Sequence, residues 1–502
     1  MNAPATLLDL LQLVPGDRTA IVIPELGIRI TYDSLRQQVL AMADVLAGHS
    51  AQRRRRVATV LPNGAPAIVA FLAASIAGTA APLNPAYPYE EIFFFLGDTS
   101  ADVLLCPAHG AEQARSAAAD RGIPALTVEM DAQGAVHLVE PRRKSAAKPP
   151  APEDVALILH TSGSTGRPKR VPLRHSNLVV SAANVAHTYS LTPEDVSLCI
   201  MPLFHIHGLV ASTLAPLISG GTVVVPTKFN PLPFWRTVHE HRVTWYSGVP
   251  TMHHLLLTRA HGHKHHAGTL RFIRSASAPM PPEIIHKMEE IFSVPFVEAY
   301  GMTEASHQMS SNPLPPRHRK PGSVGQATGI RISVVDQRGH HLGHGERGEV
   351  VIQGPSVFSG YENDPEANAA SFIKGWFRTG DQGWLDKDNY LHLSGRIKDL
   401  IIRGGENVSP REIDEVLLAH PAVAEAVTFA MPHPVLGEEV VAAVVLHEAG
   451  GATESVLLKH CRDRLAEFKC PKKIFMVHSI PLTATGKIRR QQVAAALLDG
   501  QP

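Results

Sequence analysis

The sequence predicts an α/β fold, with a large N-terminal domain of βαβ-type sheets plus a β-subdomain, followed by a small α+β C-terminal domain. Three observations predict it. Short apolar strands alternate with helices through the first part of the chain, which is the pattern of parallel βαβ units. Between residues 332 and 393 the pattern changes to short strands separated by Gly and Asp turns, typical of an antiparallel sheet. Beyond residue 412, helical segments flank two strands, which indicates a small separate domain.

The individual elements follow from the spacing of apolar residues. Leu35, Val39, Met42 and Leu46 lie three or four residues apart, so residues 33–46 are predicted to form a helix. Residues 131–153, rich in Pro, Ala, Lys and Arg, are predicted to be a surface connection. The other helices are expected at 65–77, 176–189, 234–241, 413–419 and 453–467. The strands are expected at 20–23, 29–32, 57–61, 103–106, 155–159, 222–226, 243–246, 294–297, 332–336, 348–353, 390–393, 422–430 and 439–446.

The composition excludes several classes of protein. The net charge of +1 over 502 residues gives no electrostatic basis for nucleic-acid binding. The four cysteines form no CxxC pair, and the N-terminus has no basic segment followed by an apolar one, so a reducing, cytoplasmic setting is expected. The uncharged stretch 65–83 is interrupted by Pro66, Gly78 and Pro82, which favours a buried helix over a membrane span. The histidine-rich run 261–266 is predicted to be an exposed loop, and whether it binds a metal stays open.

A loop rich in hydroxyls and glycine follows the predicted strand 155–159. Four hydroxyl residues and two glycines occur in six positions, and such a segment presents backbone and side-chain donors to an anion. A lysine closes the loop with a compact positive charge. The spacing is not that of a Walker loop. The residues are Thr161, Ser162, Gly163, Ser164, Thr165, Gly166 and, three positions on, Lys169.

Four further stretches carry residue types suited to nucleotide chemistry. EAYGMTE at 298–304 follows a predicted strand, and carboxylates near a phosphate loop imply a divalent cation such as Mg²⁺. In WFRTGD at 376–381, Asp381 follows a predicted Gly turn and is suited to accept from both ribose hydroxyls. GRIKDLIIRGGEN at 395–407 is dense in charge and lies where the antiparallel β pattern gives way to the C-terminal α+β pattern. PLTATGKIRR at 481–490 places Lys487 on a Gly turn.

In this order and spacing, the five stretches resemble the adenylate-forming superfamily of acyl- and aryl-CoA synthetases, luciferase and peptide-synthetase adenylation domains, from about residue 20 to 490. The resemblance implies a two-step ligase that uses ATP, Mg²⁺ and CoA. A carboxylate attacks the α-phosphate of ATP to give an acyl-adenylate and pyrophosphate, and a thiol then displaces AMP. It also implies an ATP- and acyl-binding domain at 1–396 and a mobile C-terminal domain at 397–502, hinged near Lys398. Small molecules are the expected partners; the oligomeric state is open.

The resemblance also assigns roles to individual residues. The loop from Thr161 to Lys169 would hold the β- and γ-phosphates, with Thr165 and Glu304 on Mg²⁺. Tyr300, flanked by Ala299 and Gly301, would stack on adenine, while Thr303 would contact the α-phosphate. Asp381 would hold the ribose hydroxyls, with Arg396 beside ribose and phosphate. Lys487 would bridge the acyl carboxylate and the α-phosphate. Arg170 departs from the family, which usually has Gly there; its role stays open.

The acyl substrate is predicted from the stretch MPLFHIHG at 201–208 and its neighbours. His205 is counted among the catalytic residues, and His207, Arg274, Ser275 and His307 are expected to line the acyl pocket. Such a set would suit an anionic tail, such as a second carboxylate. The alternative is that the histidines bond the backbone and merely close the site.

The amino-acid sequence of four stretches resembles that of the oxalate–CoA ligases of plants and fungi: residues 201–209, 244–251, 272–278 and 304–315. Oxalate is therefore the expected substrate. A medium- or long-chain fatty acyl-CoA ligase or an aryl-CoA (4-coumarate-like) ligase is the nearest alternative. An adenylation module that loads a carrier protein and a non-enzymatic nucleotide-binding protein are the other two.

Overall fold

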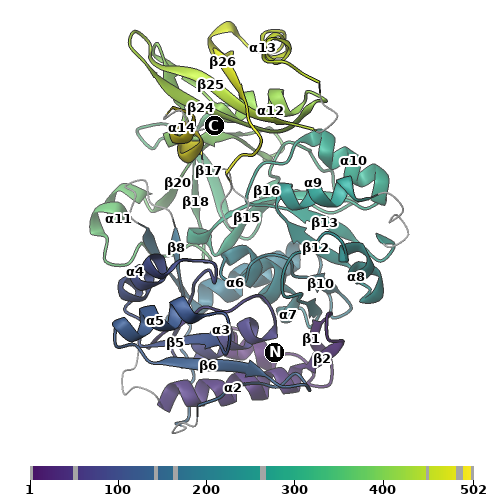
Figure 1. Ribbon diagram of the computed structural model, residues 1–502, viewed down its shortest axis with the longest axis vertical. Helices are drawn as coiled ribbons and strands as arrows, with labels where there is room; N and C mark the ends of the chain where they lie inside the picture. Colours follow the sequence, from purple (N-terminus) through teal and green to yellow (C-terminus); the bar gives the residue numbers. More distant parts are fainter. Residues whose placement is uncertain are drawn as a thin grey trace.

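Two large sheets form one end of the molecule, and a smaller sheet with its helices forms the other (Figure 1). The computed structural model describes residues 4–48, 55–140, 145–161, 168–260, 267–447, 451–481 and 490–498. Among these residues, the strands group into sheets of nine, seven, five and five. The first two belong to the predicted βαβ part, and the other two correspond to the β-subdomain and the C-terminal segment.

The nine-stranded sheet has the order β16-β15-β14-β13-β12-β10-β11-β1-β2. Its central pairs from β14 to β1 are parallel, whereas the pairs at both edges are antiparallel. The carboxyl ends of the parallel strands therefore meet at one edge, which is where ligands bind in such sheets. The strands are β1 (Thr19–Ile23), β2 (Ile28–Thr31), β10 (Val196–Leu198), β11 (Thr222–Val224), β12 (Trp245–Gly248), β13 (Phe272–Ser275), β14 (Phe296–Met302), β15 (His307–Ser311) and β16 (Gln326–Ala327).

The seven-stranded sheet has the order β7-β6-β5-β3-β4-β8-β9, with parallel central pairs and an antiparallel strand at each edge. Its strands are β3 (Arg56–Thr59), β4 (Thr79–Pro82), β5 (Val103–Pro107), β6 (Ala125–Met130), β7 (Val136–Leu138), β8 (Val155–Thr161) and β9 (Lys169–Arg174). The helix α6 (His175–Thr188) contacts β8 and β9 of this sheet and β15 of the other, so it joins the two.

Apolar faces of the helices fill the space around these sheets. The helix α3 (Ala65–Ala77) is buried on nearly every side, as expected for a helix that is apolar all round. The other helices of this part are α1 (Leu7–Gln12), α2 (Tyr32–Gly48), α4 (Tyr89–Thr99), α5 (Glu112–Asp120), α7 (Ala215–Ile218), α8 (Phe234–Glu240), α9 (Pro250–Thr258) and α10 (Pro282–Phe292), with the π-helix η1 (His207–Leu214) and the 3-10 turn η3 (Thr303–Ala305). In the described part of the chain, no helix combines the length and apolar character needed to cross a bilayer.

The β-subdomain contains β17 (Arg331–Val335), β18 (Gly348–Gln353), β19 (Phe372–Ile373), β20 (Trp376–Leu385) and β21 (Leu391–Arg396), with the helix α11 (Pro365–Ser371). All its strand pairs are antiparallel, as predicted. The short 3-10 turn η4 (Ile397–Asp399) connects β21 to the last sheet.

The last sheet has its own apolar core, built around Ile401, Ile413, Leu417 and Val440. Its strands are β22 (Ile401–Arg403), β23 (Glu406–Val408), β24 (Val423–His433), β25 (Gly437–Leu446) and β26 (Lys473–Met476). The accompanying helices are α12 (Pro410–Leu418), α13 (Glu454–Arg462), η5 (Glu467–Lys469) and α14 (Arg490–Leu498). This arrangement is the predicted α+β domain, seen in yellow-green at the top of Figure 1.

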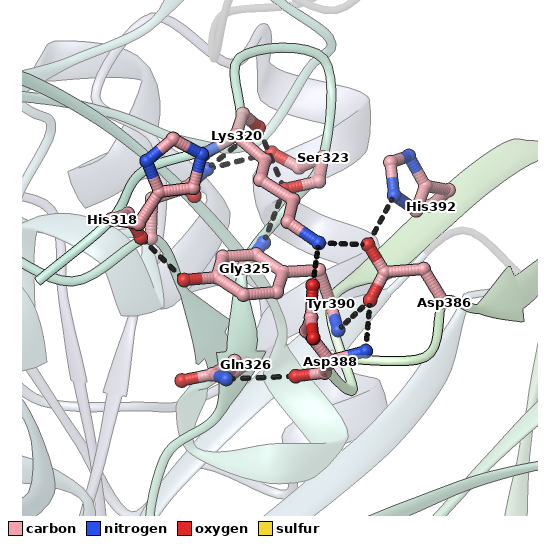
Figure 2. Close-up of polar contacts among 10 residues, drawn as sticks. His318, Lys320, Ser323, Gly325, Gln326, Asp386, Asp388, Tyr390 and His392 are labelled. Atoms are coloured by element: carbon pink, nitrogen blue, oxygen red, sulfur yellow. Dashed lines mark hydrogen bonds and ion pairs between the residues drawn. The ribbon is translucent and has the colours of Figure 1, made fainter.

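An ion-pair cluster fixes the β-subdomain to the nine-stranded sheet (Figure 2). The Nζ atom of Lys320, in the loop after β15, lies 2.5 Å from Asp386 and 2.7 Å from Asp388, both in the turn between β20 and β21. The Tyr390 hydroxyl donates to the carbonyl of His318. Backbone hydrogen bonds between residues 324–325 and Leu391 extend the contact. The strand β21 begins beside this cluster and ends at Arg396. The cluster therefore helps to fix the strand that carries this predicted nucleotide-binding residue.

Three local predictions were wrong. The predicted surface connection 131–153 contains the edge strand β7, because Val136 packs into the core despite its polar neighbours. Asp381 does not follow a turn but lies within β20, where Gly380 adopts a positive φ of 72° inside the strand. Glu298 does not lie beyond its strand but inside β14, buried and accepting a 3.0 Å hydrogen bond from the Gly322 N–H.

Candidate active site

The two ends of the predicted phosphate loop meet in an antiparallel pair, with Thr161 at the end of β8 opposite Lys169 at the start of β9. Ser162, Gly163, Ser164, Thr165 and Gly166 lie outside the described residues. The Lys169 Nζ atom sits 4.6 Å above the ring of Tyr361, a cation–π contact. Both loop ends therefore face the segment around residue 361.

Glu304 is buried in η3, between the strands β14 and β15. Its Oε1 atom accepts a 2.9 Å hydrogen bond from the Tyr361 hydroxyl and lies 3.5 Å from the Thr161 hydroxyl oxygen. Burial and the charge of Glu304 raise the pKa of Tyr361, which keeps its hydroxyl a donor. Tyr361 was not predicted, since a Tyr after Gly in a loop is a weak signal; the contact with Glu304 identifies it.

Tyr300, Asp381 and Arg396 converge, although they come from three strands. The Tyr300 hydroxyl donates to Asp381, and the Arg396 Nε atom lies 2.9 Å from the other carboxylate oxygen of Asp381. Burial, and next the Asp381 charge, raise the pKa of Tyr300 well above its ordinary value. Ala299 and Gly301 flank Tyr300 in β14, and a Cβ on Gly301 would lie 2.0 Å from the His307 carbonyl oxygen. Gly301 therefore permits the close pairing of β14 and β15.

Three of the four predicted acyl residues, His207, Arg274 and His307, gather where β12, β13, β15 and η1 meet. Arg274 is fully buried, and its guanidinium contacts His207, His307 and three other side chains. The Nη1 atom lies 3.1 Å from His207 Nε2, and the Nη2 atom lies 3.1 Å from His307 Nε2. The two histidine rings stack with centroids 4.8 Å apart. The histidines thus contact side chains, so the idea that they only bond the backbone is not what the structure shows.

Three members of this cluster were not predicted. These neutral side chains accept hydrogen bonds from Arg274, and they are Tyr189, Ser247 and Gln308. None of these residue types indicates an acyl pocket by itself. Ser275 is buried at the carboxyl end of β13, and its hydroxyl has no hydrogen-bond partner in the described structure. His205 is half-buried just before η1, where its Nδ1 atom accepts from the His207 N–H at 3.3 Å.

Arg170 lies in β9, one residue beyond the end of the predicted phosphate loop. Its guanidinium donates to the Asp98 carbonyl and lies 3.1 Å from the Glu362 carboxylate, which Arg56 also binds. His160, opposite Arg170 in the β8–β9 pair, contacts the Asp98 carboxylate at 3.1 Å. Since Glu362 follows Tyr361, this ion cluster fixes both the base of the loop and the Tyr that holds Glu304.

The other predicted residues are separate from these clusters or outside the described chain. Thr303 is buried beside Glu304 in η3. Lys398 lies in η4, between β21 of the β-subdomain and β22 of the last sheet. Lys487 and the histidine run 261–266 lie outside the described residues. Among the residues that are described, no group of three or more His, Cys, Asp or Glu side chains is arranged to hold a metal ion.

Two family models match the chain: "AMP-binding enzyme" over residues 12–362 and "AMP-binding enzyme C-terminal domain" over residues 412–487. The chain belongs to the AMP-binding enzymes. It is 43% identical over 457 residues to an oxalate–CoA ligase of Arabidopsis thaliana, covering 88% of each chain. It is 40% identical over 518 residues to an oxalate–CoA ligase of Saccharomyces cerevisiae, covering 95% of this chain and 94% of the other. The crystal structure of ATP-bound MatB from Rhodopseudomonas palustris superposes with a TM-score of 0.91 at 31% identity, over 100% of both chains.

These comparisons confirm the superfamily and the fold class predicted from the motifs. The enzyme is an AMP-forming acid–CoA ligase. The clusters described above occupy the region of the chain that the first family model covers, apart from Asp381 and Arg396, which lie between the two models.

Proposed function

We propose that this AMP-forming ligase activates a small dicarboxylate, with oxalate as the leading candidate, and transfers the acyl group to coenzyme A. Two of the relatives described above are oxalate–CoA ligases. The single observation in this chain that carries the proposal is the environment of Arg274.

Arg274 is a fully buried cation whose contacts are all neutral groups. Among the described residues, no carboxylate forms an ion pair with it. An unpaired buried charge is costly, by several kcal/mol at order of magnitude. A substrate carboxylate in the same pocket would supply the missing negative charge. A fatty or aryl acid would leave the cation unpaired, so the pocket favours a second carboxylate over an apolar chain.

The nucleotide roles are assigned to the residues that meet in the structure. Tyr300, between Ala299 and Gly301, stacks on adenine, and Asp381 accepts from the ribose hydroxyls with Arg396 beside it. Thr303 contacts the α-phosphate. The phosphate loop, ending in Lys169, holds the β- and γ-phosphates.

Mg²⁺ fits the residues beside the loop. The Glu304 carboxylate and the Thr161 hydroxyl oxygen lie together, and hard oxygen ligands are what Mg²⁺ prefers. Thr165, in the undescribed part of the loop, is the further candidate ligand. The ion would offset the phosphate charges during adenylation.

In the first half-reaction, a carboxylate oxygen of the acid attacks the α-phosphorus, and the bond to pyrophosphate breaks. In the second, the CoA sulfur attacks the acyl carbon and AMP leaves. Lys487 is assigned to the charge that builds up in the first step, and His205, just before η1, to the junction of acyl and nucleotide sites. The domain of residues 397–502 turns about Lys398 between the two steps.

Pyrophosphate release with ATP, Mg²⁺ and CoA tests the substrate. The panel consists of oxalate, malonate, acetate, octanoate and 4-coumarate at equal concentration. Preference for oxalate or malonate supports the proposal. Preference for octanoate or 4-coumarate keeps the ligase and overturns the dicarboxylate assignment.

Lys487→Ala separates the half-reactions. Adenylate formation should be abolished, whereas thioester formation from preformed adenylate should be largely retained. Equal loss of both would contradict the role assigned to Lys487.

A further inference from the structure

All three guanidinium nitrogens of the fully buried Arg274 contact neutral side chains. An arginine side chain carries five N–H bonds. The Nε–H donates to the Tyr189 hydroxyl at 2.9 Å. The Nη1 atom lies 2.7 Å from Ser247 Oγ and 3.1 Å from His207 Nε2, and the Nη2 atom lies 3.0 Å from Gln308 Oε1 and 3.1 Å from His307 Nε2. Every guanidinium nitrogen thus contacts neutral acceptors, so a direct Arg274–carboxylate contact would have to displace at least one of them.

The same contacts fix the protonation of both histidines. Arginine cannot accept a hydrogen bond, so each Nε2 atom must be the acceptor and carry no proton. A neutral imidazole has one N–H, which must then be at Nδ1. The His207 Nδ1 atom lies 3.1 Å from Ser277 Oγ, which it reaches as a donor. The Ser247 Oγ atom, which accepts from Arg274, lies 2.6 Å from the same Nε2 atom, so the Ser247 hydroxyl and Arg274 share the single lone pair of that nitrogen.

The electrostatics agree with a neutral His207 ring. Burial, and then His307 and Arg274, hold the pKa of His207 well below its ordinary value. The positive charge of the pocket is therefore carried by Arg274, and the hydrogen bond from Arg274 polarises the neutral His207 ring.

The backbone at the outer end of the network is strained. Ser277 has a φ of +74° and His307 a φ of +108°, both in the region that side-chain-bearing residues avoid. Such conformations are unfavourable for residues with side chains and persist where the surroundings hold them, which is common at ligand sites. Ser277 accepts from His207, so its own hydroxyl proton is directed to another acceptor.

We propose that Arg274 is a positioning residue that holds His207 and His307 in the Nδ1–H tautomer, so that the far carboxylate of the acid is bound by neutral donors with the Arg274 charge behind them. The proposal rests on the dicarboxylate function proposed above. The hydroxyl donor that the geometry points to for this carboxylate is that of Ser277, which accepts from His207 and keeps its own proton free to donate. An acid without a second carboxylate leaves this donor unpaired, which disfavours its binding.

Histidine tautomers are measurable in the substrate-free enzyme by ¹⁵N NMR with selectively labelled histidine. His207→Gln and His307→Gln spectra identify the two residues by loss of their signals. Both should show a protonated Nδ1 and an unprotonated Nε2. His175 is an internal control with the opposite tautomer, because its Nδ1 atom accepts from the Leu7 N–H and its Nε2 atom donates to the Ser75 carbonyl. A protonated Nε2 on His207 or His307 in the wild-type enzyme overturns the proposal.

Arg274→Lys then separates charge from positioning, since lysine keeps the cation but has only three donors in another geometry. The tautomer signals should change, and kcat/KM for oxalate should fall by about 100-fold or more, with less than about tenfold change for acetate. Oxalate activity within about threefold of wild type would mean that the charge alone suffices and would overturn the positioning role. The NMR result does not depend on turnover. A wild-type enzyme with the expected tautomers but no dicarboxylate preference would refute the proposed function and leave the tautomer assignment standing.

Discussion

Replacing Glu298 with Gln should remove a pH dependence from the stability of the protein. Glu298 is 7% exposed in β14, where, among the described residues, the Gly322 N–H alone hydrogen-bonds its carboxyl group. Burial raises its pKa from 4.5 to about 8; the Gly322 hydrogen bond and Arg411 oppose the shift, and Glu415 adds to it. The carboxyl is therefore protonated at neutral pH in the folded enzyme, whereas it is ionised in the unfolded chain.

The sign and size of the effect follow by linkage. The folded state holds a proton that the unfolded state loses between pH 4.5 and about 8, so the free energy of unfolding decreases as the pH rises through that window. The slope is about 1.4 kcal/mol per pH unit, or at most about 5 kcal/mol over the window. Glutamine has nearly the same shape and no titration, so Glu298→Gln lacks this slope.

Thermal unfolding of the two proteins between pH 5 and pH 8.5 measures the difference. With an unfolding entropy of about 2.1 cal/mol/K per residue over roughly 400 residues, 1 kcal/mol corresponds to about 1.2 °C. Between pH 6 and pH 8 the Tm of the wild type should fall by about 3 °C relative to Glu298→Gln. Glu290→Gln, at an exposed position of α10, is the matched control and should show no such trend. A difference between wild type and Glu298→Gln that stays constant with pH would refute the reasoning.

Three further substitutions test the clusters around the nucleotide site. Asp381→Asn should weaken ATP binding by about 10- to 100-fold in calorimetry, because a charged acceptor is lost, and unchanged affinity would rule out the ribose contact. Lys320→Met should move acid unfolding to higher pH. Lys320 and backbone N–H groups hold the pKa of Asp386 at about 2, so wild-type stability from this carboxylate is lost only as the pH falls from about 4 towards that value. Arg170→Gly should lower the Tm by about 1–4 °C and raise the KM for ATP, since Asp98 and Glu362 lose a partner next to the end of the phosphate loop; an unaltered KM would leave Arg170 a purely structural residue.

The sequence was a good guide wherever local spacing decides the structure. The helix predicted at 65–77 is α3 to the residue, and the strand predicted at 348–353 is β18, because both are apolar runs bounded by turn residues. The motif residues Tyr300, Asp381 and Arg396 were assigned to one nucleotide, and they are in contact although 96 positions separate the first from the last.

What the sequence could not provide was the partner of each buried polar group. Tyr361 and Glu362 lie in an ordinary loop, and only the folded chain shows that they connect Glu304 to Arg170. The five side chains around the Arg274 guanidinium come from the residue that follows α6 and from η1, β12 and β15, so this arrangement is a property of the tertiary structure. Glu298 was misplaced because a carboxylate in a strand is unusual, and its burial depends on the loop that carries Gly322.

If the Arg274 cluster makes this acid–CoA ligase select a doubly charged acid, as we propose, oxalate should prevail when acids compete for the same enzyme. Oxalate, acetate and octanoate are mixed at equal concentration with ATP, Mg²⁺ and limiting CoA, and the acyl-CoA products are quantified by mass spectrometry. The structure predicts that oxalyl-CoA exceeds each of the other products by about 100-fold or more, as expected for a site with buried donors that only an anion satisfies. A mixture dominated by octanoyl-CoA or acetyl-CoA would mean that the Arg274 cluster does not select an acid with a second carboxylate.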